Sequence, residues 1–279
     1  MEFIFDIVID TVLDGIRMLP FLFGAFLLLE TLEHYSTAFV NRTLIKINRA
    51  GPLLGAVFGC IPQCGFSVMA TNLYAGGVVS LGTLLSVYLS TSDEAILIMM
   101  SNPGRGKEIL SLLAVKVIIG IAAGYLVDLF LTKKISRPKE IGSLCDHCGC
   151  HDHHGILRPA LRHTLQVFGF VVLFSGILNL LIQGFGLEAI SRYLLQGSIF
   201  QPFFAALIGM VPNCAASVLL TELYLGGTLS FASVISGLCT NAGVGLVVLF
   251  RVNKNRKENL KILGLLYGIA VLAGWLLSL

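Results

Sequence analysis

The sequence predicts an all-α polytopic membrane protein built as two inverted-topology repeats, each with spanning helices and a broken or re-entrant helical hairpin. Two observations lead to this prediction. Hydrophobic residues make up 56% of the 279-residue chain and charged residues only 13%, a much smaller charged share than in soluble domains. The stretch 61–91 also recurs at 211–241, with Pro, Cys, Tyr and Gly-Gly matched as well as aliphatic residues. Since about 20 apolar residues cross a bilayer, we expect about ten hydrophobic helices, half-length ones included.

Each repeat is expected to contain the same series of helical segments. In the first repeat, residues 1–132, they lie at 7–29, 51–61, 66–75, 78–100 and 108–131. In the second repeat, residues 163–279, they lie at 164–186, 202–211, 216–225, 228–250 and 260–279. The second and third segments of each repeat are half-length and meet at a proline-containing break, which predicts a re-entrant hairpin or a kinked span. The fourth segment is interrupted near its middle by polar residues, at 90–94 and at 239–243.

The positions of Lys and Arg orient the two repeats. If each hairpin returns to its starting side, each repeat crosses the membrane an odd number of times, which inverts the second repeat relative to the first. With the amino terminus outside, the basic segments at 42–49, 133–162 and 251–257 all lie in the cytoplasm, as the positive-inside rule favours. Inverted repeats whose broken helices meet near the midplane are typical of secondary transporters, which expose one site alternately to each side.

Small residues and a few charges complete the helical segments. Glycines spaced four apart, within 51–59 and again within 120–124, predict helix faces that pack closely against a neighbour. Three charged residues, Glu30, Lys116 and Asp128, are expected near the ends of spans, where a long side chain carries its charge to the interface.

The two hairpin tips and the two interruptions are expected to converge on one substrate site. Two thiols, those of Cys64 and Cys214, would meet there, and thiolates select soft metals or trivalent metalloids. The alternative is that these cysteines only fill space. Acids inside a membrane, here Asp93 and Glu94, usually serve as ligands or proton carriers, although a helix end in a water-filled vestibule would also accommodate them. The candidate substrate-binding residues are Gln63, Cys64, Ser67, Thr91, Asp93, Glu94, Asn213, Cys214, Ser217, Glu222 and Asn241.

The linker between the repeats, residues 133–162, carries the strongest local metal-binding pattern. The spacing of Cys145 and Cys148 lets two thiolates reach one tetrahedral ion. His-rich tracts bind zinc, nickel, copper and cobalt, so the pattern does not identify the metal, and a solvated linker is the alternative. We interpret the tract as a cytoplasmic segment that captures or senses metal. Its candidate ligands are Cys145, His147, Cys148, Cys150, His151, His153 and His154.

Other patterns restrict the function. Residues 102–107 lack the first glycine and the Ser/Thr of a P-loop, so we expect a proton or sodium gradient rather than a nucleotide to supply energy. No histidine lies well inside a span, which disfavours an intramembrane metallohydrolase, and we expect no enzymatic activity, no required cofactor and no nucleic-acid partner. The expected partners are the lipid bilayer and a metal or metalloid substrate. An organic-anion permease, a metal-sensing membrane protein and a homo-oligomeric state are left open.

The repeated motifs resemble those of the ten-helix heavy-metal exporter permeases, which are also labelled arsenic efflux proteins or manganese transporters. The resemblance lies in IPQCGFSV and VPNCAASV, in TNLYAGG and TELYLGG, in STSDEA and in the His/Cys-rich linker. It implies efflux across the plasma membrane of a bacterium or archaeon. Export of a soft metal would place Cys64 and Cys214 on the substrate. Transport of manganese, a hard ion, would instead give weight to Asp93, Glu94, Glu222, Gln63 and Asn213.

Overall fold

The computed structural model consists of helices and turns throughout the part of the chain that it describes. That part comprises residues 19–20, 23–24, 27, 50–61, 65–100, 105–131, 161, 164–165, 168–169, 173, 200–212 and 214–279. Within it, three helical segments are long and apolar enough to cross a membrane: Gly106–Leu131, Phe231–Val252 and Arg256–Ser278. The molecule is therefore a multi-pass membrane protein, as its composition predicts.

The helices of the first repeat that the structure describes begin and end within three residues of the predicted bounds, whereas the predicted segments 7–29 and 164–186 lie largely outside the described residues. The described helices are the helix Ala50–Gly59, α3 (Gly65–Ala75), α4 (Leu81–Ser90), α5 (Asp93–Met100) and α6 (Gly106–Leu131). The N-cap of α4 is Ser80, whose hydroxyl accepts a hydrogen bond from the backbone N–H of Thr83, so one of the free amide groups at the helix start is satisfied. The interruption of the fourth segment is confirmed, because α4 and α5 are separate helices.

The second repeat has the same series. Its helices are α9 (Gln201–Gly209), α10 (Cys214–Leu225), α11 (Phe231–Thr240), α12 (Val244–Val252) and α13 (Arg256–Ser278). The hydroxyl of Ser230 caps α11 by accepting from the N–H of Ser233, as Ser80 does for α4. Since α11 begins 150 residues after α4, and α13 begins 150 residues after α6, the duplication extends to the helix boundaries. The inverted orientation of the two copies stays a prediction.

The repeated Gly-Gly pair ends the third helical segment of each repeat. Gly77 and Gly227 have φ angles of 72° and 75°, in the left-handed region that residues with a Cβ rarely occupy. The N–H of Val78 bonds the carbonyl of Leu73, five residues earlier, at 2.8 Å, which is the longer bond of a Schellman motif. The second glycine of each pair is therefore required by the backbone, and the motif reverses the chain before the interrupted helix.

In each repeat three helices pack closely through small residues. They are the helix Ala50–Gly59, α4 and α6 in the first repeat, and α9, α11 and α13 in the second. In the first, Gly55 of the helix Ala50–Gly59 and Gly120 of α6 lie against the backbone of α4: an added Cβ would come within 3.0 Å of a carbonyl oxygen in either case. The hydroxyl of Ser86 in α4 donates to the carbonyl of Pro52 at 2.5 Å. Its counterpart Ser236 donates to the carbonyl of Pro202 at 3.0 Å. Both predicted glycine faces are thus confirmed as close-packing surfaces.

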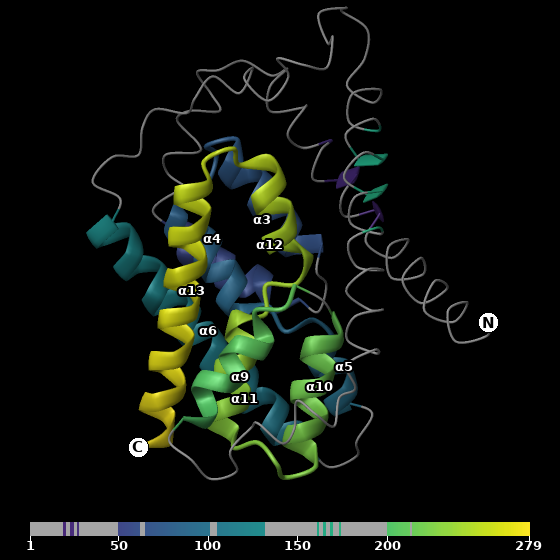
Figure 1. Ribbon diagram of the computed structural model, residues 1–279, viewed down its shortest axis with the longest axis vertical. Coiled ribbons are helices and arrows are strands. Elements are labelled where there is room, and N and C mark those ends of the chain that lie inside the picture. Colours follow the sequence, from purple (N-terminus) through teal and green to yellow (C-terminus); the bar gives the residue numbers. More distant parts are fainter. Residues whose placement is uncertain are drawn as a thin grey trace, which may run out of the picture.

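Each repeat packs one of its helices against a helix of the other repeat. The helix after the first tip, α3, packs on α12 of the second repeat, and the helix after the second tip, α10, packs on α5 of the first. Figure 1 shows α3 and α12 together in the upper part of the molecule and α10 and α5 in the lower part. The hydroxyl of Tyr88 lies 2.5 Å from the hydroxyl of Thr71 and donates to the carbonyl of Gly245 at 3.1 Å. A tyrosine of the first repeat therefore reaches the backbone of α12.

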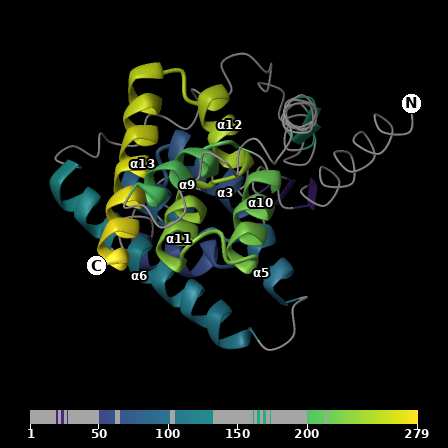
Figure 2. The same cartoon turned by 60° about the horizontal axis from the view of Figure 1, so that its bottom comes forward.

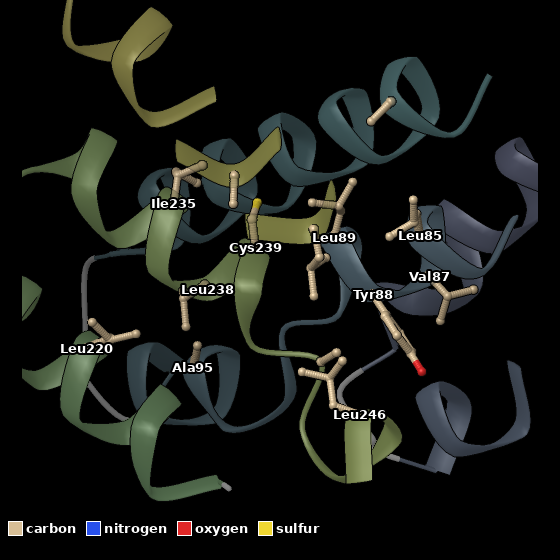
Figure 3. Close-up of a cluster of buried hydrophobic side chains, with 14 of the residues drawn as sticks. Leu85, Val87, Tyr88, Leu89, Ala95, Leu220, Ile235, Leu238, Cys239 and Leu246 are labelled. Carbon is tan, nitrogen blue, oxygen red and sulfur yellow. The ribbon is translucent and has the colours of Figure 1, made fainter. Parts of the chain in front are cut away.

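Burial separates the central helices from the outer ones. Of the most apolar part of Phe231–Val252, 94% is buried, against 28% for both α6 and α13. Figure 2 shows α11 near the centre and the long helices α6 and α13 at the periphery. The exposed faces of the outer helices carry large apolar side chains such as Leu129, Phe130 and Leu276, which suit contact with lipid. One buried cluster joins the repeats, with Leu89 and Cys239 near its centre (Figure 3).

Candidate functional site

The two interruptions lie inside the protein. Around the first, Ser90, Thr91 and Ser92 are each at most 2% exposed. At the second, Asn241 is 5% exposed, and its side-chain oxygen accepts from the N–H of Gly243 at 3.0 Å. Gly243 has a φ angle of 53°, so the chain turns here in a conformation that favours glycine. Non-helical backbone at membrane depth is tolerated where protein or a water-filled cavity surrounds it.

A lysine connects the two interruptions. Lys116 is fully buried in the middle of α6. Its ammonium donates to the carbonyl of Thr91, at the end of α4, and to the carbonyl of Leu238 in α11 at 2.8 Å. The expectation that Lys116 snorkels from a span end is therefore wrong, since the side chain points inward to helix ends rather than outward to the interface. Its central position in a 26-residue apolar helix was the available signal.

Asp128 also has a specific partner rather than only an interfacial position. Its carboxylate accepts from the N–H of Gly82 at 2.8 Å and from the hydroxyl of Ser80 at 2.6 Å. A carboxylate is favourable at the amino end of a helix, where N–H groups are free and the helix dipole is positive. Asp128 therefore fixes the start of α4.

Two of the predicted substrate-binding residues, Ser67 and Ser217, lie in α3 and α10. Ser67 in α3 is fully buried, and a Cβ on Gly245 of α12 would lie 2.9 Å from it. Ser217 in α10 is 2% exposed, and its carbonyl accepts from the hydroxyl of Thr221 at 2.7 Å. In α3 the hydroxyl of Thr71 makes the equivalent bond to the carbonyl of Ser67 at 2.6 Å. Both α3 and α10 thus contain a hydrogen bond from a threonine hydroxyl to the carbonyl of the serine four residues earlier.

The other predicted substrate residues are placed less fully. Asp93 and Glu94 are the first two residues of α5, and Cys214 is the first residue of α10. Glu222 is exposed on α10. Gln63, Cys64 and Asn213, and the linker ligands from Cys145 to His154, lie outside the described residues. Within the described ranges, no three His, Cys, Asp or Glu side chains come together as a metal site.

A pair of tyrosine–glutamate hydrogen bonds links the repeats at opposite ends, and the sequence does not predict it. Tyr74 at the end of α3 donates to the carboxylate of Glu258 in the first turn of α13. Its counterpart Tyr224 at the end of α10 donates to Glu108 in the first turn of α6 at 3.1 Å. Glu108 also pairs with Arg105 at 3.0 Å. Each bond crosses from one repeat to the other, and its residues recur at the repeat spacing.

The fold and the site together define a class of protein. It is a multi-pass helical membrane protein with two interrupted helices at its centre, which the buried ammonium of Lys116 connects. The chain belongs to the family described as "Putative, 10TM heavy-metal exporter", whose model matches residues 4–194 and 164–279. The family resemblance seen in the motifs is thereby confirmed. No curated protein and no solved structure matches the chain.

Proposed function

We propose that this protein is a secondary-active transporter, without enzymatic activity, that exports a heavy-metal ion or a metalloid by alternating access. The observation that carries the proposal is the exchange of helices, in which α3 packs on α12 and α10 packs on α5. The start of α3 lies against the start of α12, at Ser67 and Gly245, which supports the hypothesis that each tip lies beside the interruption of the opposite repeat. α3 and α10 lie toward opposite ends of the molecule (Figure 1), which supports an inverted arrangement that exposes the centre to each side in turn.

A soft metal or trivalent metalloid is the substrate class that the tips favour. Cys64 immediately precedes α3, and Cys214 is the first residue of α10. The amino end of a helix stabilises negative charge, and the thiolate is the form of cysteine that binds metal. Two such thiolates, one from each repeat, would hold an ion that prefers sulfur.

A hard divalent cation such as manganese is the second candidate, and a different observation favours it. The groups buried around the interruptions are rich in oxygen: the hydroxyls of Ser90, Thr91 and Ser92 and the amide of Asn241. Hard cations prefer oxygen ligands. The acidic start of α5 would add negative charge at the same level. Gln63, Asn213 and Glu222 belong to this hypothesis.

Uptake into everted vesicles or proteoliposomes tests both hypotheses. Arsenite, cadmium, zinc and manganese are each offered under an imposed proton or sodium gradient. We expect uptake of arsenite or a soft cation by the wild type, and its loss in the Cys64→Ser/Cys214→Ser double variant. Cys60→Ser, a substitution outside the repeated tip motif, is the control and should retain uptake. Manganese uptake that survives the double variant but not Asp93→Asn would favour the second hypothesis, and no uptake of any metal would contradict both.

The linker is proposed to collect metal in the cytoplasm of a bacterium or archaeon, at the plasma membrane. Deletion of residues 146–154 is expected to raise the metal concentration needed for half-maximal uptake while leaving the maximal rate unchanged. Labelling by a membrane-impermeant maleimide tests the side of the membrane: Cys145, Cys148 and Cys150 should react in everted vesicles and not in intact cells. Reaction in intact cells would contradict the assigned orientation.

A further inference from the structure

The surroundings of the Lys116 ammonium are those of a bound cation. The carbonyls of Thr91 and Leu238, which accept from it, belong to the carboxyl ends of helices, because α4 ends at Ser90 and α11 ends at Thr240. The last carbonyls of a helix have no partner within the helix and carry the negative end of its dipole. The N–H of Ala242, which would bond Leu238 if α11 continued, donates to Thr240 at 3.0 Å instead. The interruption therefore turns backbone oxygens toward the ammonium.

The second repeat shows that packing alone does not require a lysine here. The position equivalent to Lys116 is Leu266 in α13, which is equally buried. Both outer helices pack through the same small residue: an added Cβ on Gly124 would lie 3.1 Å from Ser86, and one on Gly274 would lie 2.7 Å from Ser236. An apolar side chain thus serves this helix packing in one copy, while the other copy buries a charge. Burial of an ammonium is unfavourable unless other groups compensate it.

We propose that the Lys116 ammonium is a built-in monovalent cation that occupies a cation site between the carboxyl ends of α4 and α11. It is a positioning residue, because it holds the two interruptions at a fixed separation through the carbonyls of Thr91 and Leu238. The ligand class of this site is a small monovalent or alkylammonium cation. The inference goes beyond the proposed function, since it does not depend on which substrate is carried or on whether the protein transports at all.

Chemical rescue tests the proposal on the purified full-length protein. Lys116→Ala removes three carbons and the ammonium, which are the atoms of n-propylammonium. We expect the variant to lose at least about 5 °C in Tm, a shift of the size that an interaction of this kind produces. Added n-propylammonium should restore Tm in proportion to the logarithm of its concentration above the dissociation constant. Neutral 1-propanol, which has the same shape without the charge, should not.

Leu266→Ala is the matched control, because it opens a similar cavity at the equivalent position of the second repeat. Its Tm should not rise with n-propylammonium, because burial of an ammonium without compensating groups is unfavourable. Lys116→Met keeps the volume and removes the charge, so it should be less stable than the wild type and should not respond to n-propylammonium. If Lys116→Met is as stable as the wild type, or if n-propylammonium and 1-propanol act alike on Lys116→Ala, the proposal is overturned. If Lys116→Ala yields no folded protein, the Lys116→Met comparison decides. None of these readouts uses a transported substrate, so a failed transport assay leaves this result interpretable.

Discussion

The two interrupted helices, α4–α5 and α11–α12, share a scaffold and differ in chemistry. Both begin at a capping serine, and both are held by a central serine that donates to a proline carbonyl, from Ser86 in one copy and Ser236 in the other. After the interruption, α5 starts with two acidic residues, whereas α12 follows Gly243 and starts with Val244. In these two interrupted helices the packing groups are kept in both copies, while the acidic residues after the interruption occur in only one.

The starts of α4 and α11 are held by side chains from different helices in the two repeats. In the first repeat the carboxylate of Asp128, from α6, accepts from the N–H of Gly82 and the hydroxyl of Ser80. In the second repeat the amide oxygen of Gln201, from α9, accepts from the N–H of Ser230 at 3.2 Å and the hydroxyl of Ser233 at 2.8 Å. In each copy a side chain from another helix accepts from one backbone N–H and one hydroxyl at the start of the helix, and this side chain is charged in one copy and neutral in the other.

The largest expected effect comes from transferring the charge to the second repeat. Leu266→Lys would bury an ammonium that lacks the arrangement around Lys116, and an uncompensated buried charge costs about 3–5 kcal/mol. We expect little or no folded protein, measured by size-exclusion chromatography and SDS-induced unfolding. Leu260→Lys, at a position 65% exposed in the same helix, should fold normally. If Leu266→Lys is as stable as the wild type, the two copies do not differ in the way that we describe.

A methyl group at the close-packed glycines should have the next largest effect, and a similar one in both repeats. A Cβ on Gly59 would meet the carbonyl of Val87, and one on Gly209 would meet the carbonyl of Gly237. Each Gly→Ala change is expected to destabilise the protein by about 1–3 kcal/mol. Gly264→Ala is the control, since an added Cβ there meets nothing within 4 Å, and its better helix propensity should stabilise α13 by up to about 1 kcal/mol. Neutral effects at both close-packed positions would contradict the packing.

The tyrosine–glutamate bonds allow the two ends of the molecule to be compared. Tyr74 is more deeply buried than Tyr224, and hydrogen bonds to charged groups contribute about 1.5–3 kcal/mol. We expect Tyr74→Phe to lower the free energy of unfolding by an amount within that range. Tyr224→Phe should lower it by less than about 1 kcal/mol, because water competes with a more exposed hydrogen bond. Tyr267→Phe, which removes an exposed bond within the second repeat, is the control. A larger effect at Tyr224 would reverse the order that we assign to the two ends.

The smallest effect is expected at the central serines. Ser86→Ala and Ser236→Ala each remove a buried hydroxyl donor and should each cost about 1 kcal/mol. The two sites share no partner, so the double variant should show the sum of the single effects within about 0.5 kcal/mol. Unfolding of the four proteins in a double-mutant cycle checks this expectation. A coupling energy well beyond that margin would show that the two scaffolds do not act independently.

The helix boundaries could be predicted because their causes are local. Gly77 and Gly227 end helices because they adopt a positive φ. The polar residues at 90–94 and 239–243 predict interruptions because they lie within apolar segments. The place of Lys116 could not be predicted in the same way. A single lysine in an apolar helix is compatible with a snorkelling end or a buried ion, and only its neighbours decide between them. Of the candidate substrate residues, Ser67, Thr91, Ser217 and Asn241 lie at buried positions, while Glu222 lies at the surface.

The sequence by itself determined the membrane class, the duplication and the positions of the helix breaks. These features depend on composition and on the backbone preferences of a few neighbouring residues, and both can be seen in the sequence alone. The tertiary structure decided which helices exchange between repeats, which glutamate each tyrosine contacts, and where the ammonium of Lys116 lies. Tyr74 and Glu258 are 184 positions apart, and Lys116 and Leu238 are 122 apart. Contacts at such separations arise from packing of the complete helical assembly, because no local preference of the chain specifies them.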